Sequence, residues 1–134
     1  MSCDFGILNV KERITNKEAS NLYLALCNGD ISGVTPSTNI DAFYLELTEK
    51  HPEIDSIPES EIDNTDLCPW SIAFNRSPGH LIISCVWSKA EYVYDLLINL
   101  AKKHNLALYT PQSEIIIYPD GTDGSQKKPW WKFW

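Results

Sequence analysis

The fold follows from residues 80–109, which read HLIISCVWSKAEYVYDLLINLAKKHNLALY. The run His80–Trp87 is almost continuously apolar, which is typical of a strand at the centre of a sheet. Apolar residues then recur at the spacing of a helix with one buried stripe, at Val93, Leu96, Leu97 and Leu100. A second apolar run, Leu106–Tyr109, predicts another strand. The segment is therefore expected to form a strand–helix–strand unit.

Local signals mark both ends of this helix. Ser88 and Glu91 have the spacing of a capping box, in which the serine hydroxyl and the glutamate carboxylate satisfy free backbone N–H groups. The basic run Lys102–His104 complements the negative C-terminal end of the helix, and Asn105 can adopt the left-handed conformation that ends it. The helix is therefore expected between the capping serine and this asparagine.

Two elements are predicted near the N-terminus. Cys3–Val10 is short and apolar enough to form a first strand that is buried on much of both faces. Thr15 and Glu18 have the spacing of another capping box, which predicts a helix over about Asn16–Cys27. The Asn-Gly pair that follows supplies a left-handed stop for this helix.

A second helix and a hairpin fill the middle of the chain. Ser37 or Thr38 can cap this helix, Pro52 ends it, and its buried stripe consists of Ile40, Phe43, Tyr44 and Leu47. Apolar residues alternate with small or polar ones in Trp70–Phe74, which predicts a half-buried strand. The turn Asn75–Gly79 would then join this strand to the central one in a hairpin.

The order of these elements predicts an α+β domain. A final short strand at Glu114–Tyr118 completes a mainly antiparallel sheet of about five strands, with the helices packed on one face. This order is similar to a ferredoxin-like or split βαβ arrangement. We expect one domain over residues 1–118, followed by a Pro/Gly linker and a Lys/Trp-rich tail over residues 119–134.

The net charge and the lack of long apolar runs indicate which ligands and which location to expect. The 134 residues include 18 acids and 11 bases, which gives a net charge of −7. This charge argues against nucleic acid as the ligand, because a duplex-binding protein needs a cationic face. No apolar run approaches the roughly 20 residues of a membrane span, and Met1–Val10 lacks the features of a secretory signal. The cytoplasm is therefore the expected location.

The negative charge is concentrated in a loop over residues 53–69. Six of its residues are acidic and none is basic: Glu53, Asp55, Glu59, Glu61, Asp63 and Asp66. The loop is either a solvated surface or an anionic surface for a cationic partner. Trp70 would be an apolar anchor at its end, although its place in an alternating run also fits the core. The spacing does not match a calcium-binding loop, so no metal site is expected.

The C-terminal residues 127–134 read KKPWWKFW. The rings of Trp130, Trp131 and Trp134 need a cover, which could be the chain's own domain, a second copy of the chain, another protein or an interface. Such a segment is suited to lie extended in an apolar groove, with its lysines reaching carboxylates at the rim. Its positive charge also complements the acidic loop.

No residue pattern predicts a reaction. The cysteines Cys3, Cys27, Cys68 and Cys85 form no C-x-x-C pair and are expected to be small buried hydrophobes. The usual motifs for nucleotide binding, zinc proteolysis and α/β-hydrolase chemistry do not occur, so no catalytic residue or cofactor is expected. Two alternatives stay open. A small enzyme or ligand-binding domain would need Cys68, His80 or Tyr109 to meet at a cavity. A self-associating module would be held by its tail.

Four short motifs carry a resemblance to a known group: CDFGIL at residues 3–8, KHP at 50–52, PW at 69–70 and LYTPQ at 108–112. In these the chain resembles small bacterial cytosolic proteins, some of which are immunity proteins of polymorphic or contact-dependent toxin systems. The resemblance implies one non-catalytic α+β domain that binds and neutralises a cognate toxin. A nuclease with a cationic cleft would complement the acidic loop.

Overall fold

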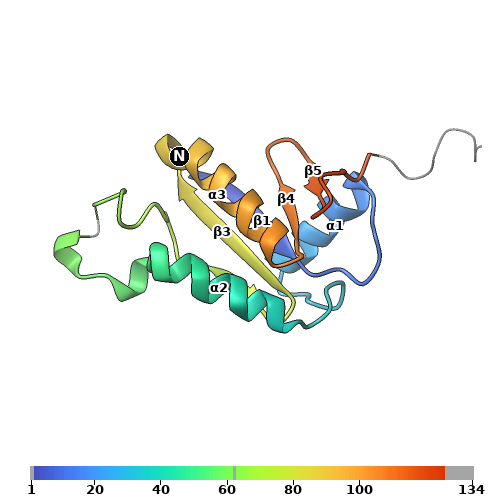
Figure 1. The fold of residues 1–134 in the computed structure, drawn as a ribbon, viewed down its shortest axis with the longest axis horizontal. Coiled ribbons are helices and arrows are strands. Elements are labelled where there is room, and N and C mark those ends of the chain that lie inside the picture. Colours follow the sequence, from blue (N-terminus) through green and yellow to red (C-terminus); the bar gives the residue numbers. More distant parts are fainter. Residues whose placement is uncertain (1, 62, 126–134) are drawn as a thin grey trace, which may run out of the picture.

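The computed structural model of the chain describes residues 2–61 and 63–125. In these residues five strands form one antiparallel sheet in the order β2-β3-β1-β4-β5 (Figure 1). Their bounds are Ser2–Leu8 for β1, Asn75–Ser77 for β2, His80–Val86 for β3, Ala107–Thr110 for β4 and Ile115–Ile117 for β5. The predicted α+β class with a five-stranded antiparallel sheet is confirmed.

The α-helices of the described residues begin and end close to the predicted positions. Their bounds are Asn16–Cys27 for α1, Thr38–Lys50 for α2 and Ala90–Lys103 for α3. Thr15 and Glu18 form the predicted capping box of α1, and Ser37 caps α2. The start of α3 differs, because a 3-10 turn over Trp87–Lys89 precedes it and no side chain caps its first turn. The capping role predicted for Ser88 is therefore wrong.

The sheet has the strand order of a ferredoxin-like domain with one strand added. β1 lies between β3 and β4 and runs antiparallel to both, so β3, α3 and β4 form a split βαβ unit around it. β2 pairs with β3 as a hairpin at one edge. β5 pairs with β4 and widens the sheet at the other edge.

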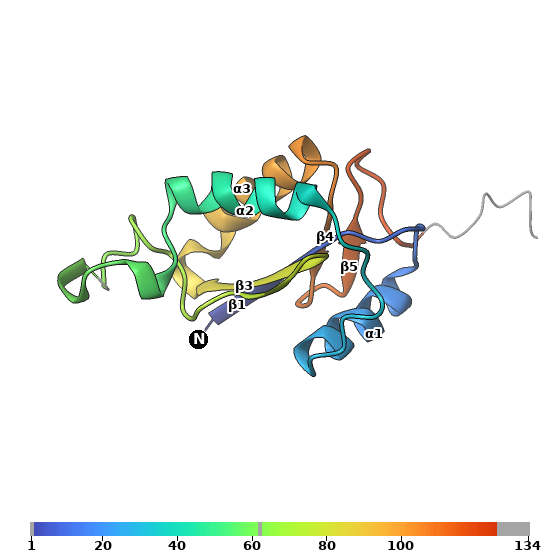
Figure 2. The same cartoon turned by 90° about the horizontal axis from the view of Figure 1, so that it is seen from below.

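The helices cover both faces of the sheet. Figure 2 shows α2 and α3 on one side of the strands and α1 on the other. Successive residues of β1 point to opposite faces. Phe5 accordingly packs with residues of α2 and α3, and Leu8 packs with residues of α1. The prediction that helices pack on one face holds for α2 and α3 and is wrong for α1, because an apolar stripe does not indicate which face it covers.

The segment before β3 also differs from the prediction. Trp70 makes an isolated bridge to Cys85, and β2 begins only at Asn75, so Trp70–Phe74 is not a strand. The apolar alternation there reflects side-chain packing, since the rings of Trp70 and Phe74 lie 5.1 Å apart between centroids. Ile72, between them, is exposed.

After β5 the chain turns back along that strand. Asp123 forms an antiparallel bridge with Ile117, and the Gly124 N–H donates to the Ile116 carbonyl at 3.0 Å. Asp120 forms an ion pair with Arg13. The chain therefore stays in contact with the domain as far as Gly124, within the stretch that composition predicts to be a linker.

His80 is buried beside the β2–β3 turn. Its Nδ1 lies 2.6 Å from the Ser77 hydroxyl, and its Nε2 lies 3.3 Å from the Asn75 side-chain oxygen. Since the Ser77 oxygen already accepts from the Gly79 N–H, its proton is available to Nδ1, and Nε2 donates to Asn75. This pattern fits a neutral ring. Burial also lowers the pKa of His80 below its ordinary value.

The buried His80 predicts a loss of stability in mild acid. As the pH falls through about 6.5, the unfolded chain binds a proton at this residue that the folded chain excludes, so the free energy of unfolding decreases. Urea titrations between about pH 5 and pH 8 would measure this decrease. In His80→Gln the decrease should be smaller, whereas His104→Gln, which removes a ring paired with Glu46, should keep it. An equal decrease in the parent chain and His80→Gln would contradict the assignment.

Candidate binding surfaces

The acidic loop forms an arm that projects beyond the C-terminal end of α2 (Figures 1 and 2). We call residues 53–69 the acidic arm. It contains two 3-10 turns, Ile54–Ser56 and Glu59–Glu61. The carboxylates of Asp55, Glu59 and Asp63 are exposed. None of the three forms a hydrogen bond or an ion pair with another residue of the described ranges.

Glu53 fixes the beginning of the arm to the domain. One oxygen of its carboxylate accepts a hydrogen bond from the Tyr44 hydroxyl, and the other accepts from the Phe74 N–H at 3.1 Å. The hydrogen bond to this carboxylate raises the pKa of Tyr44. Glu53 is half-buried and both of its oxygens are used. It is therefore an anchor of the arm, a role that the sequence did not predict, and its contact with a partner stays a prediction.

His51 fixes the end of the arm. Its Nδ1 donates to the Leu67 carbonyl at 2.9 Å, and its Nε2 lies 2.7 Å from the Tyr92 hydroxyl. The His51 ring is buried. It contacts the arm through Leu67 on one side and α3 through Tyr92 on the other. Sequence reasoning missed this role, because no local pattern links His51 to residues so far along the chain.

Two further acidic residues of the arm have partners. Asp66 forms an ion pair with Lys89 at 2.5 Å, and this hydrogen bond lowers the pKa of the Asp66 carboxyl. Glu61 accepts a hydrogen bond from the Asn64 amide at 3.0 Å. An exposed ion pair contributes little to stability, because water screens the attraction. The carboxylates of the arm without any partner in the described ranges are therefore those of Asp55, Glu59 and Asp63.

The tryptophans predicted to contact a partner fall into two groups. Trp70 is 2% exposed, and its Nε1 donates to the His51 carbonyl at 3.0 Å. It belongs to the core between the sheet and the helices α2 and α3, which corrects the prediction of an exposed anchor. Trp130, Trp131 and Trp134 lie outside the described residues.

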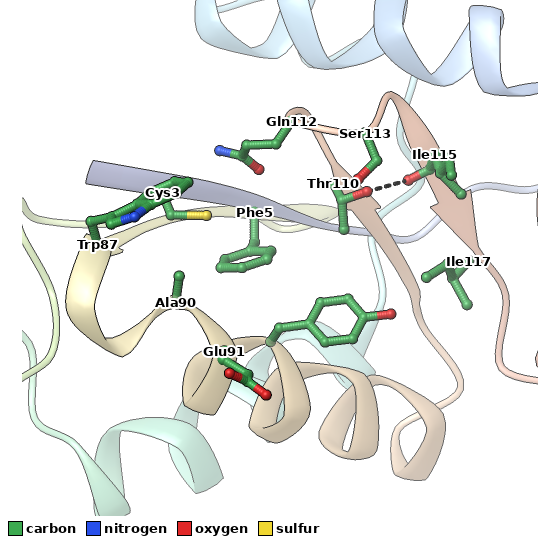
Figure 3. A pocket seen from close by; sticks show the side chains of 11 residues that line it. Cys3, Phe5, Trp87, Ala90, Glu91, Thr110, Gln112, Ser113, Ile115 and Ile117 are labelled. Atoms are coloured by element: carbon green, nitrogen blue, oxygen red, sulfur yellow. Dashed lines mark hydrogen bonds between the residues drawn. The ribbon is translucent and has the colours of Figure 1, made fainter. Parts of the chain in front are cut away.

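A second surface is an apolar groove beside α3 (Figure 3). It has a volume of about 400 Å³ and lies between α3 and the strands β1, β4 and β5. In Figure 1, α2 lies on the side of α3 that is away from β4 and β5. On the face of the sheet that α2 and α3 cover, β5 is therefore left uncovered by both helices. The groove thus follows from the extra strand. Its lining includes Phe5, Trp87, Glu91, Tyr94, Ile115 and Ile117.

No sequence pattern indicated the groove, because its lining comes from elements far apart in the chain. The spacing of Glu91 from Ser88 predicts only a capping residue. Its carboxylate is exposed at the groove and has no ion-pair or hydrogen-bond partner in the described ranges. Trp87 is 54% exposed and presents its ring at the same groove. These features make the groove a candidate binding surface for an apolar segment that carries positive charge.

The residues considered for an enzyme do not meet. Cys68 packs on the α2 and α3 face of the sheet and Tyr109 packs on the α1 face, so the sheet separates them. Three of the cysteines are buried as predicted, but Cys27 is exposed. Burial raises the pKa of Cys68 and raises that of Cys85 to about 12, which disfavours their thiolates.

Over residues 2–61 and 63–125, no group of three or more His, Cys, Asp and Glu side chains could hold a metal ion. None of the helices in this part of the chain is long and apolar enough to span a membrane. Comparisons of the chain with protein-family models, with curated proteins and with solved structures find no match.

Proposed function

We propose that this protein is a non-catalytic binding protein that neutralises a cognate bacterial toxin by direct contact through its acidic arm. The observation that carries the proposal is the set of exposed carboxylates on the arm, at Asp55, Glu59 and Asp63, which have no partner within the described residues. Unpaired charges at a protruding surface attract a partner of opposite charge and accelerate its approach. A cytoplasmic toxin with a cationic cleft, such as a nuclease, would present that charge.

The attachment of the arm supports the same proposal. Glu53 holds its beginning and His51 holds its end, each through two hydrogen bonds or close polar contacts. A surface that is already fixed before binding loses less conformational freedom in the complex. Its carboxylates can therefore contribute to affinity without a large ordering cost.

Growth protection tests the proposal. The product of the neighbouring gene in the native host would be co-expressed with the full chain, and the chain should restore growth. The variant Asp55→Asn/Glu59→Gln/Asp63→Asn should protect less at equal expression, because it removes the unpaired charge of the arm.

A matched variant controls for net charge. Asp41→Asn/Glu49→Gln/Asp95→Asn removes the same charge from exposed positions on α2 and α3, and it should protect as well as the parent chain. Failure of the parent chain to protect would overturn the proposed function. Equal protection by both variants would exclude the arm as the contact surface.

One observation favours a second candidate function. The groove beside α3 has a volume of about 400 Å³, which falls within the range of pockets that bind small ligands. A small apolar ligand is therefore a second candidate occupant of this groove.

A further inference from the structure

We propose that the groove beside α3 is the docking site of the chain's own C-terminal segment, residues 127–134. The proposal goes beyond the function of the acidic arm and does not depend on it. It rests on where the described chain ends, on the length that follows, and on the chemistry of the groove.

The described chain ends on the outer side of β5, a strand that contributes to the groove. The bridge between Asp123 and Ile117 and the hydrogen bond from Gly124 to Ile116 place this segment antiparallel to β5 on its outer side. The pairing stops there, because Asn16 at the start of α1 bonds to the Gly124 carbonyl and to the Ile116 N–H, and residues 124–125 form a turn. Ile115 and Ile117 both line the groove, as Figure 3 shows. Gly124, the last residue bonded to β5, therefore lies about one strand spacing, roughly 4.8 Å, from that strand.

The remaining length is sufficient to cross the groove. Residues 126–134 are nine residues, and nine extended residues span up to about 30 Å. The path from the outer side of β5 across β5 and β4 to β1 covers about three strand spacings, or roughly 14 Å. The segment can therefore reach the wall formed by Phe5 and Trp87 without being fully extended.

The groove and the segment have complementary chemistry. The groove offers apolar side chains, among them Phe5, Ile115 and Ile117, and one exposed carboxylate at Glu91. The segment KKPWWKFW carries four aromatic rings and three lysines. An aromatic side chain buries about 150–250 Å² when it is covered, which favours docking of these rings in an apolar groove. A lysine can bury its stem there and place its ammonium group beside Glu91.

Nuclear Overhauser contacts in the full chain test the proposal. In a sample with carbon-13 isoleucine methyl groups, the methyl groups of Ile115 and Ile117 should show contacts to indole protons. These contacts should disappear in the variant Trp130→Ala/Trp131→Ala/Trp134→Ala. Trp87 also lines the groove, so its indole protons could contact the same methyl groups. Those contacts would persist in the triple variant, which distinguishes them from contacts to the C-terminal tryptophans.

A charge reversal tests the role of the carboxylate. Glu91→Lys should lower the ratio of docked to free segment about two- to fivefold, the effect expected for an exposed ion pair. The matched variant Glu49→Lys makes the same change at an exposed position of α2 and should leave the ratio unchanged.

The alternative occupants give different results. A mixture of labelled and unlabelled chains shows contacts through an isotope filter only if the segment comes from a second copy, and that result would overturn intramolecular docking. Absence of any contact to the three C-terminal tryptophans would also overturn the proposal, and would leave the groove to a small ligand.

Discussion

Truncation of Trp70 to alanine should lower the free energy of unfolding by about 3–5 kcal/mol, the usual cost of deleting a large buried aromatic side chain. The ring packs edge-on against His51 and Phe74, with centroid separations of 6.0 and 5.1 Å. Its loss would leave a cavity and would remove the donor to the His51 carbonyl. Urea unfolding of the full chain measures the change.

The same substitution at another tryptophan provides the comparison. Trp87 is 54% exposed whereas Trp70 is 2% exposed, so Trp87→Ala should cost much less stability. Trp70→Phe should have an intermediate effect, because it keeps part of the ring contacts and loses only the hydrogen bond and the larger ring. Similar losses for Trp70→Ala and Trp87→Ala would mean that Trp70 does not occupy the core.

Neutralising the acidic arm should slow association with a cationic toxin about 10- to 100-fold at low salt. The variant Asp55→Asn/Glu59→Gln/Asp63→Asn removes charges that are exposed and unpaired within the described residues. Such charges act mainly during the approach of the partners, so the dissociation rate should change less than the association rate. Stopped-flow mixing with the purified toxin would measure both rates.

Salt separates steering by the arm from other effects. Above about 0.1 M salt the screening length falls below about 10 Å, so the difference between the parent chain and the arm variant should shrink. The variant Asp41→Asn/Glu49→Gln/Asp95→Asn should associate nearly as fast as the parent chain. Equal slowing in both variants would assign the effect to net charge, and unchanged association at low salt would remove the arm from the interface.

The helices and most of the strands could be predicted because their signals are local. The capping box at Thr15 and Glu18, the serine cap at Ser37 and the left-handed Asn105 all lie where their spacing predicts them. The apolar run at His80–Val86 is indeed a strand with neighbours on both sides. These features depend on residues a few positions apart, which a sequence shows directly.

The features that could not be predicted depend on contacts between distant residues. The side of the sheet that α1 covers is set by packing with β4 and β5, whose position is not visible in the α1 sequence. The partners of Glu53 include Phe74, and a partner of His51 is Tyr92. The groove likewise combines β1, α3, β4 and β5. The candidate site could thus be predicted as an acidic loop, but its anchors and the groove could not.

The place of β1 in the sheet has a consequence for the folding of the nascent chain. It precedes the other four strands of the sheet, and its neighbours β3 and β4 follow about 80 and 100 residues later, as in the pairs Cys3–Cys85 and Gly6–Tyr109. A nascent chain on the ribosome therefore cannot pair β1 with β3 until residue 86 has emerged, or with β4 until residue 110 has emerged. Contacts of such long sequence separation slow folding and expose apolar strands meanwhile. Folding of this domain should thus be slower than that of a domain built from local contacts, and the nascent chain should benefit from chaperones that cover β1.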